Sequence, residues 1–132
     1  MLTNTTQTAP RVLVADDDPV VRHLVTAIVK QEGYTPVAVN DGREAYRLLQ
    51  RDADFKAAIF DMMMPHLEGL DIMRHMQTEK RLLRIPVMMI TSEQSFSLIA
   101  KSHAAGATIF LPKPFTITQL QTMLRILLSK SH

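Results

Sequence analysis

The chain has 132 residues, of which 46% are hydrophobic and 21% are charged, with a formal net charge of +2. This balance is typical of one soluble domain that buries about two-thirds of its unfolded surface. The sequence has no cysteine, which excludes disulfides and thiolate metal sites, and no apolar run approaches the ~18 residues of a membrane helix. Because the Lys and Arg residues are dispersed, the charge does not favour nucleic-acid binding, and we expect a cytoplasmic protein.

The N-terminal part of the chain predicts a leader followed by the first strand and helix. Residues 1 to 10 are polar, rich in Thr and closed by a proline, so we expect a flexible leader before a single domain over residues 11 to 132. Val12 to Ala15 is a short apolar run, typical of a buried strand. Asp18 followed by Pro19 is a strong helix start, and Gly33 stands where the helix should end.

Four further cycles of an apolar run and an amphipathic segment follow. The predicted strands are Thr35 to Val39, Ala57 to Phe60, Ile85 to Ile90 and Thr108 to Leu111, with a turn at Asn40 to Gly42. The predicted helices are about Arg43 to Gln50, a helix after Gly69 through Ile72, Met73 and Met76 that runs out in the charged stretch Glu79 to Arg84, a weaker one near Glu93 to Ala105, and Thr116 to Ser129. Five such cycles with short connections predict an α/β fold, a doubly wound five-stranded parallel sheet with helices on both faces.

Polar side chains follow four of the predicted strands. Asp16 and Asp17 come after the first strand, Asp61 after the third, Thr91 after the fourth and Lys113 after the fifth. The carboxyl ends of parallel strands share one edge of a sheet, where ligands bind at the switch point of the strand order. Crowded carboxylates repel one another unless a cation lies among them, and an oxygen-rich set of ligands suits Mg²⁺.

The stretches that carry these residues resemble the receiver domain of two-component response regulators. The matching motifs are VLVADDDP around Asp16 and Asp17, DMMMP from Asp61, Thr91-Ser92 after an apolar strand, and KPF from Lys113. Each motif is short, but their order and their positions at strand ends are specific in combination. The resemblance covers Arg11 to about Lys130 and is to a single receiver of the chemotaxis-regulator type. It implies a flavodoxin-like sheet with strand order 2-1-3-4-5.

The resemblance implies that Asp61 accepts a phosphoryl group from a histidine kinase or a histidine phosphotransfer protein. Its carboxylate would attack phosphorus and form an aspartyl phosphate. Asp17, Asp61 and the backbone carbonyl of Met63 would hold Mg²⁺ directly, and Asp16 would act mainly through bound water. Such a protein is a signalling switch that catalyses its own phosphorylation and dephosphorylation, rather than an enzyme.

The resemblance also assigns roles to the residues at the last two strands. Thr91 and Lys113 would each contact an oxygen of the phosphoryl group. Thr91 and Phe110 would then form a switch, with Phe110 turning inward as Thr91 moves toward the phosphoryl group. This change would repack the surface formed by the fourth helix, the fifth strand and the fifth helix, where a protein effector would bind. Members of the family commonly have a cis bond between the residues that match Lys113 and Pro114.

Three other interpretations are open at this point. A flavodoxin-like cofactor binder would share the fold, but Asp16 to Asp18 would repel its phosphate. An aspartyl-phosphate-forming hydrolase of the haloacid dehalogenase type would need a second aspartate at the position of Met63. The chain could also be the receiver fragment of a longer DNA-binding response regulator.

Overall fold

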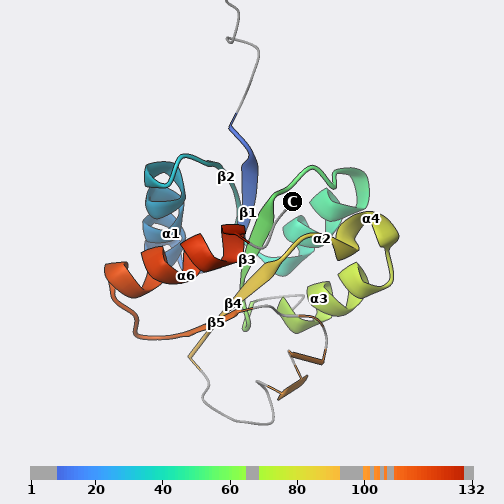
Figure 1. Ribbon diagram of the computed structural model, residues 1–132. Helices are drawn as coiled ribbons and strands as arrows, with labels where there is room; N and C mark the ends of the chain where they lie inside the picture. Colours follow the sequence, from blue (N-terminus) through green and yellow to red (C-terminus); the bar gives the residue numbers. More distant parts are fainter. Residues whose placement is uncertain are drawn as a thin grey trace, which may run out of the picture.

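A computed structural model describes residues 9–64, 69–92, 100–101, 103–104, 106 and 109–129. The centre of the fold is a five-stranded parallel sheet in the order β2-β1-β3-β4-β5, which confirms the predicted doubly wound topology (Figure 1). The strands are β1 Arg11–Ala15, β2 Thr35–Val39, β3 Ala57–Asp61, β4 Val87–Thr91 and β5 Ile109–Pro112. The predicted leader lies almost entirely outside the described residues and stays a prediction.

Helices cover both faces of the sheet. The helices are α1 Pro19–Gln31, α2 Gly42–Arg51, α3 Gly69–Gln77, α4 Lys80–Leu83 and α6 Ile117–Ser129. Helices α1 and α6 pack on one face, and α2, α3 and α4 pack on the other (Figure 1). The predicted helix over residues 93–105 falls largely outside the described residues. Among the described residues, no helix combines the length and apolar character needed to cross a membrane.

The helix starts follow local side-chain chemistry. Asp18 caps α1, because its carboxylate accepts a hydrogen bond of 2.9 Å from the N–H of Val20, as the sequence predicts. Asp41 caps α2 in the same way, since its Oδ1 accepts from the N–H of Glu44 at 2.9 Å. The predicted turn at Asn40 to Gly42 was therefore one residue too long, because Gly42 is already the first residue of α2.

A short additional helix occupies the charged stretch after α3. The sequence predicted that α3 would simply run out there, but residues 80–83 form α4. The reason is tertiary, because the side chain of Leu82 is fully buried in the core on this face of the sheet. The buried Leu82, rather than the exposed Leu83 beside it, thus provides the contact that keeps this turn helical.

The two central strands are apolar on both faces. Every residue of β3 and β4 is buried, as expected for parallel strands covered by helices on both sides. Leu13, Ala58 and Phe60 face the α2 and α3 side, whereas Val12 and Ile59 face the α1 and α6 side. The only polar side chains that are buried among the described residues are Asp16, Asp61 and Thr91, and all three stand at or just after the carboxyl end of a strand.

Candidate functional site

The register of the sheet brings the strand ends into line. Ala15 at the end of β1 pairs with Phe60 of β3, and Asp61 at the end of β3 pairs with Ile90 of β4. Thr91 at the end of β4 pairs with Pro112, the last residue of β5. The polar residues that end or follow these strands therefore lie at one edge of the sheet, as the sequence predicted.

Three carboxylates converge at this edge. Asp16, Asp17 and Asp61 each offer a carboxylate oxygen, and these atoms all lie within 4.8 Å of one another. Asp16 and Asp61 are buried, whereas Asp17 is exposed. The cluster therefore has two desolvated members at its base and one member that faces solvent.

Asp16 has an unsatisfied oxygen. Its Oδ1 accepts a hydrogen bond of 2.9 Å from the N–H of Asp18, but within the described part of the chain no donor reaches its buried Oδ2. The pKa of Asp16 is raised to about 7, mainly by burial; the neighbouring Asp61 carboxylate adds to the rise, and the hydrogen bond from the N–H of Asp18 opposes it. Without a cation, this carboxyl group is only partly ionised at neutral pH.

This donor set fits a small divalent cation. A buried oxygen without a partner and a group of close carboxylates are both stabilised by a positive charge. Oxygen ligands with one exposed side suit Mg²⁺, which keeps several waters when it binds. The residues present at the end of β1 and β3 are therefore compatible with the predicted magnesium site.

Lys113, in the loop after β5, contacts the same carboxylate cluster. Its Nζ lies 3.2 Å from Oδ2 of Asp61, and the N–H of Met63 donates to Oδ1 of Asp61 at 3.1 Å. The backbone N–H of Lys113 also donates to the carbonyl of Thr91 at 2.8 Å, which joins the loop after β5 to the end of β4. The peptide bond between Lys113 and Pro114 is cis. Asp61 thus has a cation on one carboxylate oxygen and a backbone donor on the other.

The two predicted switch residues lie on β4 and β5. Thr91 is buried, and its hydroxyl donates to Sδ of Met62 at 3.6 Å. Phe110 is half-buried and packs against the core on the α2 and α3 side. Its ring meets the ring of His103 edge-on, with the centroids 5.4 Å apart. Nothing in the sequence shows that the side chain of Met62 lies against the hydroxyl of Thr91.

Gly69 is a second residue whose importance the sequence did not show. A Cβ atom at Gly69 would lie 2.6 Å from the carbonyl oxygen of Asp61 and 3.0 Å from Sδ of Met89. The N–H of Gly69 donates to the carbonyl of Met62 at 3.2 Å. The first turn of α3 therefore lies directly against the backbone of the acidic site, and only glycine allows this approach.

Gly69→Ala is expected to destabilise the protein by about 1–3 kcal/mol, because the new methyl group must displace the backbone of Asp61. Replacing glycine by alanine inside a helix usually stabilises a protein, so the destabilisation expected here is the opposite of the usual effect. Urea unfolding of both proteins measures the difference. A variant as stable as the wild type would show that α3 can move away from β3 without cost.

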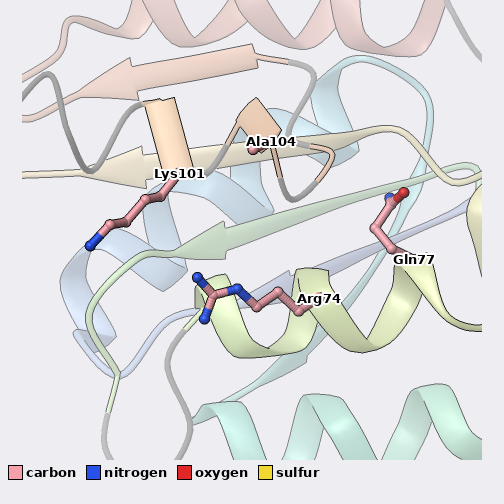
Figure 2. A pocket seen from close by; sticks show the side chains of 4 residues that line it. All are labelled: Arg74, Gln77, Lys101 and Ala104. Atoms are coloured by element: carbon pink, nitrogen blue, oxygen red, sulfur yellow. The ribbon is translucent and has the colours of Figure 1, made fainter.

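A separate pocket lies between α3 and residues Lys101 and Ala104. It has a volume of about 270 Å³ and is lined by Arg74 and Gln77 from α3 and by Lys101 and Ala104. Figure 2 shows that the charged ends of Arg74 and Lys101 extend toward the same side, with Gln77 at the other end. None of these residues belongs to the acidic cluster.

The chain matches one family over most of its length. The sequence profile of the response regulator receiver domain matches residues 12–125. Response regulator MprA of Mycolicibacterium vanbaalenii is 36% identical over 121 residues, which are 92% of this chain and 51% of that protein. Chemotaxis protein CheY1 of Helicobacter pylori is 32% identical over 119 residues, which are 89% of this chain and 96% of that protein. The chain thus spans about half the length of its MprA relatives.

Solved structures agree with the sequence matches. Chemotaxis response regulator CheY4 of Vibrio cholerae superposes with a TM-score of 0.83 and 30% identity, covering 91% of this chain and 99% of that one. The receiver domain of a sensor histidine kinase from Pseudomonas aeruginosa gives a TM-score of 0.81 and 25% identity, covering 92% of this chain and 99% of that one. The latter structure has a magnesium ion coordinated in its active site cleft.

The fold and the acidic edge define a phospho-accepting signalling module, and the sequence matches assign it to a family. This chain belongs to the response regulator receiver domains of two-component signalling. Receiver domains are signalling switches that bind Mg²⁺ at an acidic pocket and interact with histidine kinases and downstream effectors. The predicted family, fold class and general function are therefore confirmed.

Proposed function

We propose that Asp61 is the phosphoryl acceptor of this receiver. The observation that carries the proposal is the ion pair of 3.2 Å between Lys113 Nζ and Asp61 Oδ2, at the point where the carboxylates of Asp16, Asp17 and Asp61 converge. Of these carboxylates, Asp61 is the one with a cation already in contact. It is also largely buried, with only 5% of its surface accessible, so it is a desolvated nucleophile at the base of the cluster.

The transfer is a substitution at phosphorus. An oxygen of Asp61 forms a bond to the phosphorus of a phosphohistidine, the P–N bond breaks, and the imidazole leaves with the electron pair of that bond. Asp61, Asp17 and the backbone carbonyl of Met63 would hold Mg²⁺, and Asp16 would act mainly through bound water. When bound, the ion offsets the negative charge of the phosphoryl oxygens.

Lys113 and Thr91 complete the arrangement around the phosphoryl group. Lys113 moves its ammonium from the carboxylate of Asp61 to a phosphoryl oxygen, a short displacement for a flexible side chain. Thr91 donates its hydroxyl to a second phosphoryl oxygen. Together these contacts orient the group for in-line transfer, in which positioning and charge neutralisation provide most of the catalysis.

The phosphoryl donor docks at the same edge of the sheet. Val20 at the start of α1, Met63 after β3 and Ile117 at the start of α6 are all apolar and exposed, with 76%, 51% and 52% of their surfaces accessible. An apolar rim around a buried carboxylate suits a protein that must bring a phosphohistidine close to Asp61. A histidine kinase takes its phosphoryl group from ATP, which places the reaction in the cytoplasm.

The output is a change in the surface formed by β5, α6 and the predicted helix near residues 93–105, which lies largely outside the described residues. Phe110 lies on β5 between this surface and the core, and its ring contacts His103. As Thr91 moves toward the phosphoryl group, Phe110 turns inward and alters the position of the segment that bears His103. A downstream protein effector that binds one conformation of this surface more tightly than the other then responds to phosphorylation. We propose that the receiver domain extends over residues 11–132, which includes the matched residues 12–125.

Incubation of the wild type with acetyl phosphate and Mg²⁺ tests this proposal. We expect an adduct of ~80 Da in the intact mass, absent when EDTA replaces Mg²⁺. Reduction of the acyl phosphate with borohydride, followed by peptide mapping, should locate the modification at Asp61. The absence of an adduct, or its location at another residue, contradicts the assignment.

A further inference from the structure

Arg22, on α1, contacts the loop between β1 and α1 through two of its groups. This loop, which consists of Asp16, Asp17 and Asp18, is called the acidic loop below. The guanidinium Nη1 of Arg22 donates a hydrogen bond of 2.8 Å to the backbone carbonyl of Asp16. The backbone N–H of Arg22 donates to the carbonyl of Asp18 at 2.9 Å, as usual in the first turn of a helix. The side-chain bond is the additional feature, and it is partly buried.

The acidic loop carries two of the three carboxylates that converge at the edge of the sheet. Asp16, Asp17 and Asp61 each place an oxygen within 4.8 Å of the other two. Ionised carboxylates at such distances repel one another, and this repulsion pushes the loop away from β3. The N–H of Asp16 donates to the carbonyl of Val39 at 3.4 Å, a long bond that restrains the backbone weakly. The bond from the Arg22 side chain to the backbone of Asp16 is shorter and charge-assisted, so it restrains the loop more strongly.

We propose that Arg22 is a positioning residue that holds the acidic loop in the geometry in which it binds Mg²⁺. The inference rests on the proposed roles of Asp16 and Asp17 at the metal. Arg22 is not a ligand of the ion and acts through the backbone carbonyl of Asp16. Because the loop is already in place when the ion arrives, less of the binding free energy is spent on ordering it.

The positive charge of Arg22 lets the sign of one measurement separate positioning from electrostatics. Arg22→Met keeps a long side chain but removes both the hydrogen-bond donor and the charge. If only the charge mattered, its loss close to a cation site would strengthen Mg²⁺ binding, because like charges repel. If Arg22 positions the loop, the loop must be ordered during binding in the variant, and the affinity falls. We expect the affinity for Mg²⁺ to fall about threefold to tenfold.

Titration of the isotope-labelled protein with magnesium chloride at constant ionic strength, followed by NMR, measures this affinity. The matched control is Lys30→Met, which removes one positive charge from the exposed side chain near the other end of α1. Its affinity for Mg²⁺ should stay at the wild-type value.

Amide hydrogen exchange in the metal-free protein shows whether the loop itself has loosened. Arg22→Met should speed the exchange of the Asp18 N–H, which donates to the carboxylate of Asp16 at 2.9 Å. The Ala58 N–H, which donates to the carbonyl of Pro86 at 3.0 Å in the core of the sheet, should exchange at the wild-type rate. A general loss of stability would instead speed the exchange of both groups.

Mg²⁺ binding by Arg22→Met that is as tight as that of the wild type, or tighter, overturns the inference. A fall of the same size in Lys30→Met overturns it too, as does equal acceleration of exchange at Asp18 and Ala58. Asp17→Asn distinguishes these results from failure of the proposed function, because it removes a proposed ligand and should lose most of the affinity. If Asp17→Asn binds Mg²⁺ like the wild type, the proposed metal site is what fails.

Discussion

Asp61→Asn is expected to show no adduct of ~80 Da after acetyl phosphate and Mg²⁺, under conditions in which the wild type is modified. The amide is a poor nucleophile toward phosphorus. It also replaces one of the oxygens that converge with Asp16 and Asp17 and so weakens the metal site. The fold should remain, because asparagine has nearly the same shape and its oxygen can still accept the N–H of Met63. Intact mass measures the adduct, and circular dichroism checks the fold.

The matched control for this experiment is Asp18→Asn. Asp18 lies in the same acidic run but serves as the N-cap of α1, and asparagine caps helices about as well as aspartate. We therefore expect this variant to be phosphorylated like the wild type. Loss of phosphorylation in both variants would show that the overall negative charge of the edge, rather than Asp61 itself, determines the reaction.

Asp16→Asn is expected to make the metal-free protein more stable at neutral pH, because it removes a buried carboxylate whose ionisation lowers the free energy of unfolding. Burial raises the pKa of Asp16 to about 7 in the folded chain, against about 4 in an unfolded one. The pKa of Asp16 is higher in the folded chain than in the unfolded chain. The neutral carboxyl group therefore makes its full contribution to the free energy of unfolding below about pH 4, and this contribution is lost as the pH rises to about 7. Each unit of pKa difference corresponds to about 1.4 kcal/mol, so the loss amounts to a few kcal/mol.

Urea unfolding in EDTA at several pH values between ~4 and ~8 measures this effect. The free energy of unfolding of Asp16→Asn minus that of the wild type should grow with pH and level off above about pH 7. With added Mg²⁺, the wild type should be more stable than Asp16→Asn above that pH. The ion binds ionised carboxylates, and the wild type has one more carboxylate at the site than the variant. Parallel pH profiles for the two proteins would show that Asp16 is not responsible for the penalty.

Much of the site was visible in the sequence because each functional side chain interrupts or follows an apolar strand. Asp61 follows four apolar residues, and Thr91 and Lys113 follow the next two apolar runs. A parallel sheet puts such positions at one edge whatever the details of packing. The structure accordingly brings Asp61 and Lys113 to within 3.2 Å, although they are far apart in the chain.

Features that depend on a neighbour distant in sequence were not predictable. The sequence of the stretch Glu79 to Arg84 contains mostly charged residues, and only the buried position of Leu82 explains why a helix forms there. In the sequence Gly69 looks like an ordinary residue of the connection before a helix, and only its short distance to the Asp61 carbonyl shows why glycine is needed there. The raised pKa of Asp16 likewise depends on burial, which its position in a row of three aspartates does not reveal.

The sequence by itself determined the order of the five strands and of helices α1, α2, α3 and α6, and the residues that meet at the acidic edge, while the family followed from motifs that resemble those of receiver domains. The element order and the edge depend on local periodicity, on caps and on the direction of parallel strands, which the order of residues along the chain specifies. The tertiary structure alone decided that α3 approaches Asp61 through Gly69 and that Thr91 donates to Met62. Such contacts follow from the packing of side chains from different elements, where differences of less than an ångström select one partner over another.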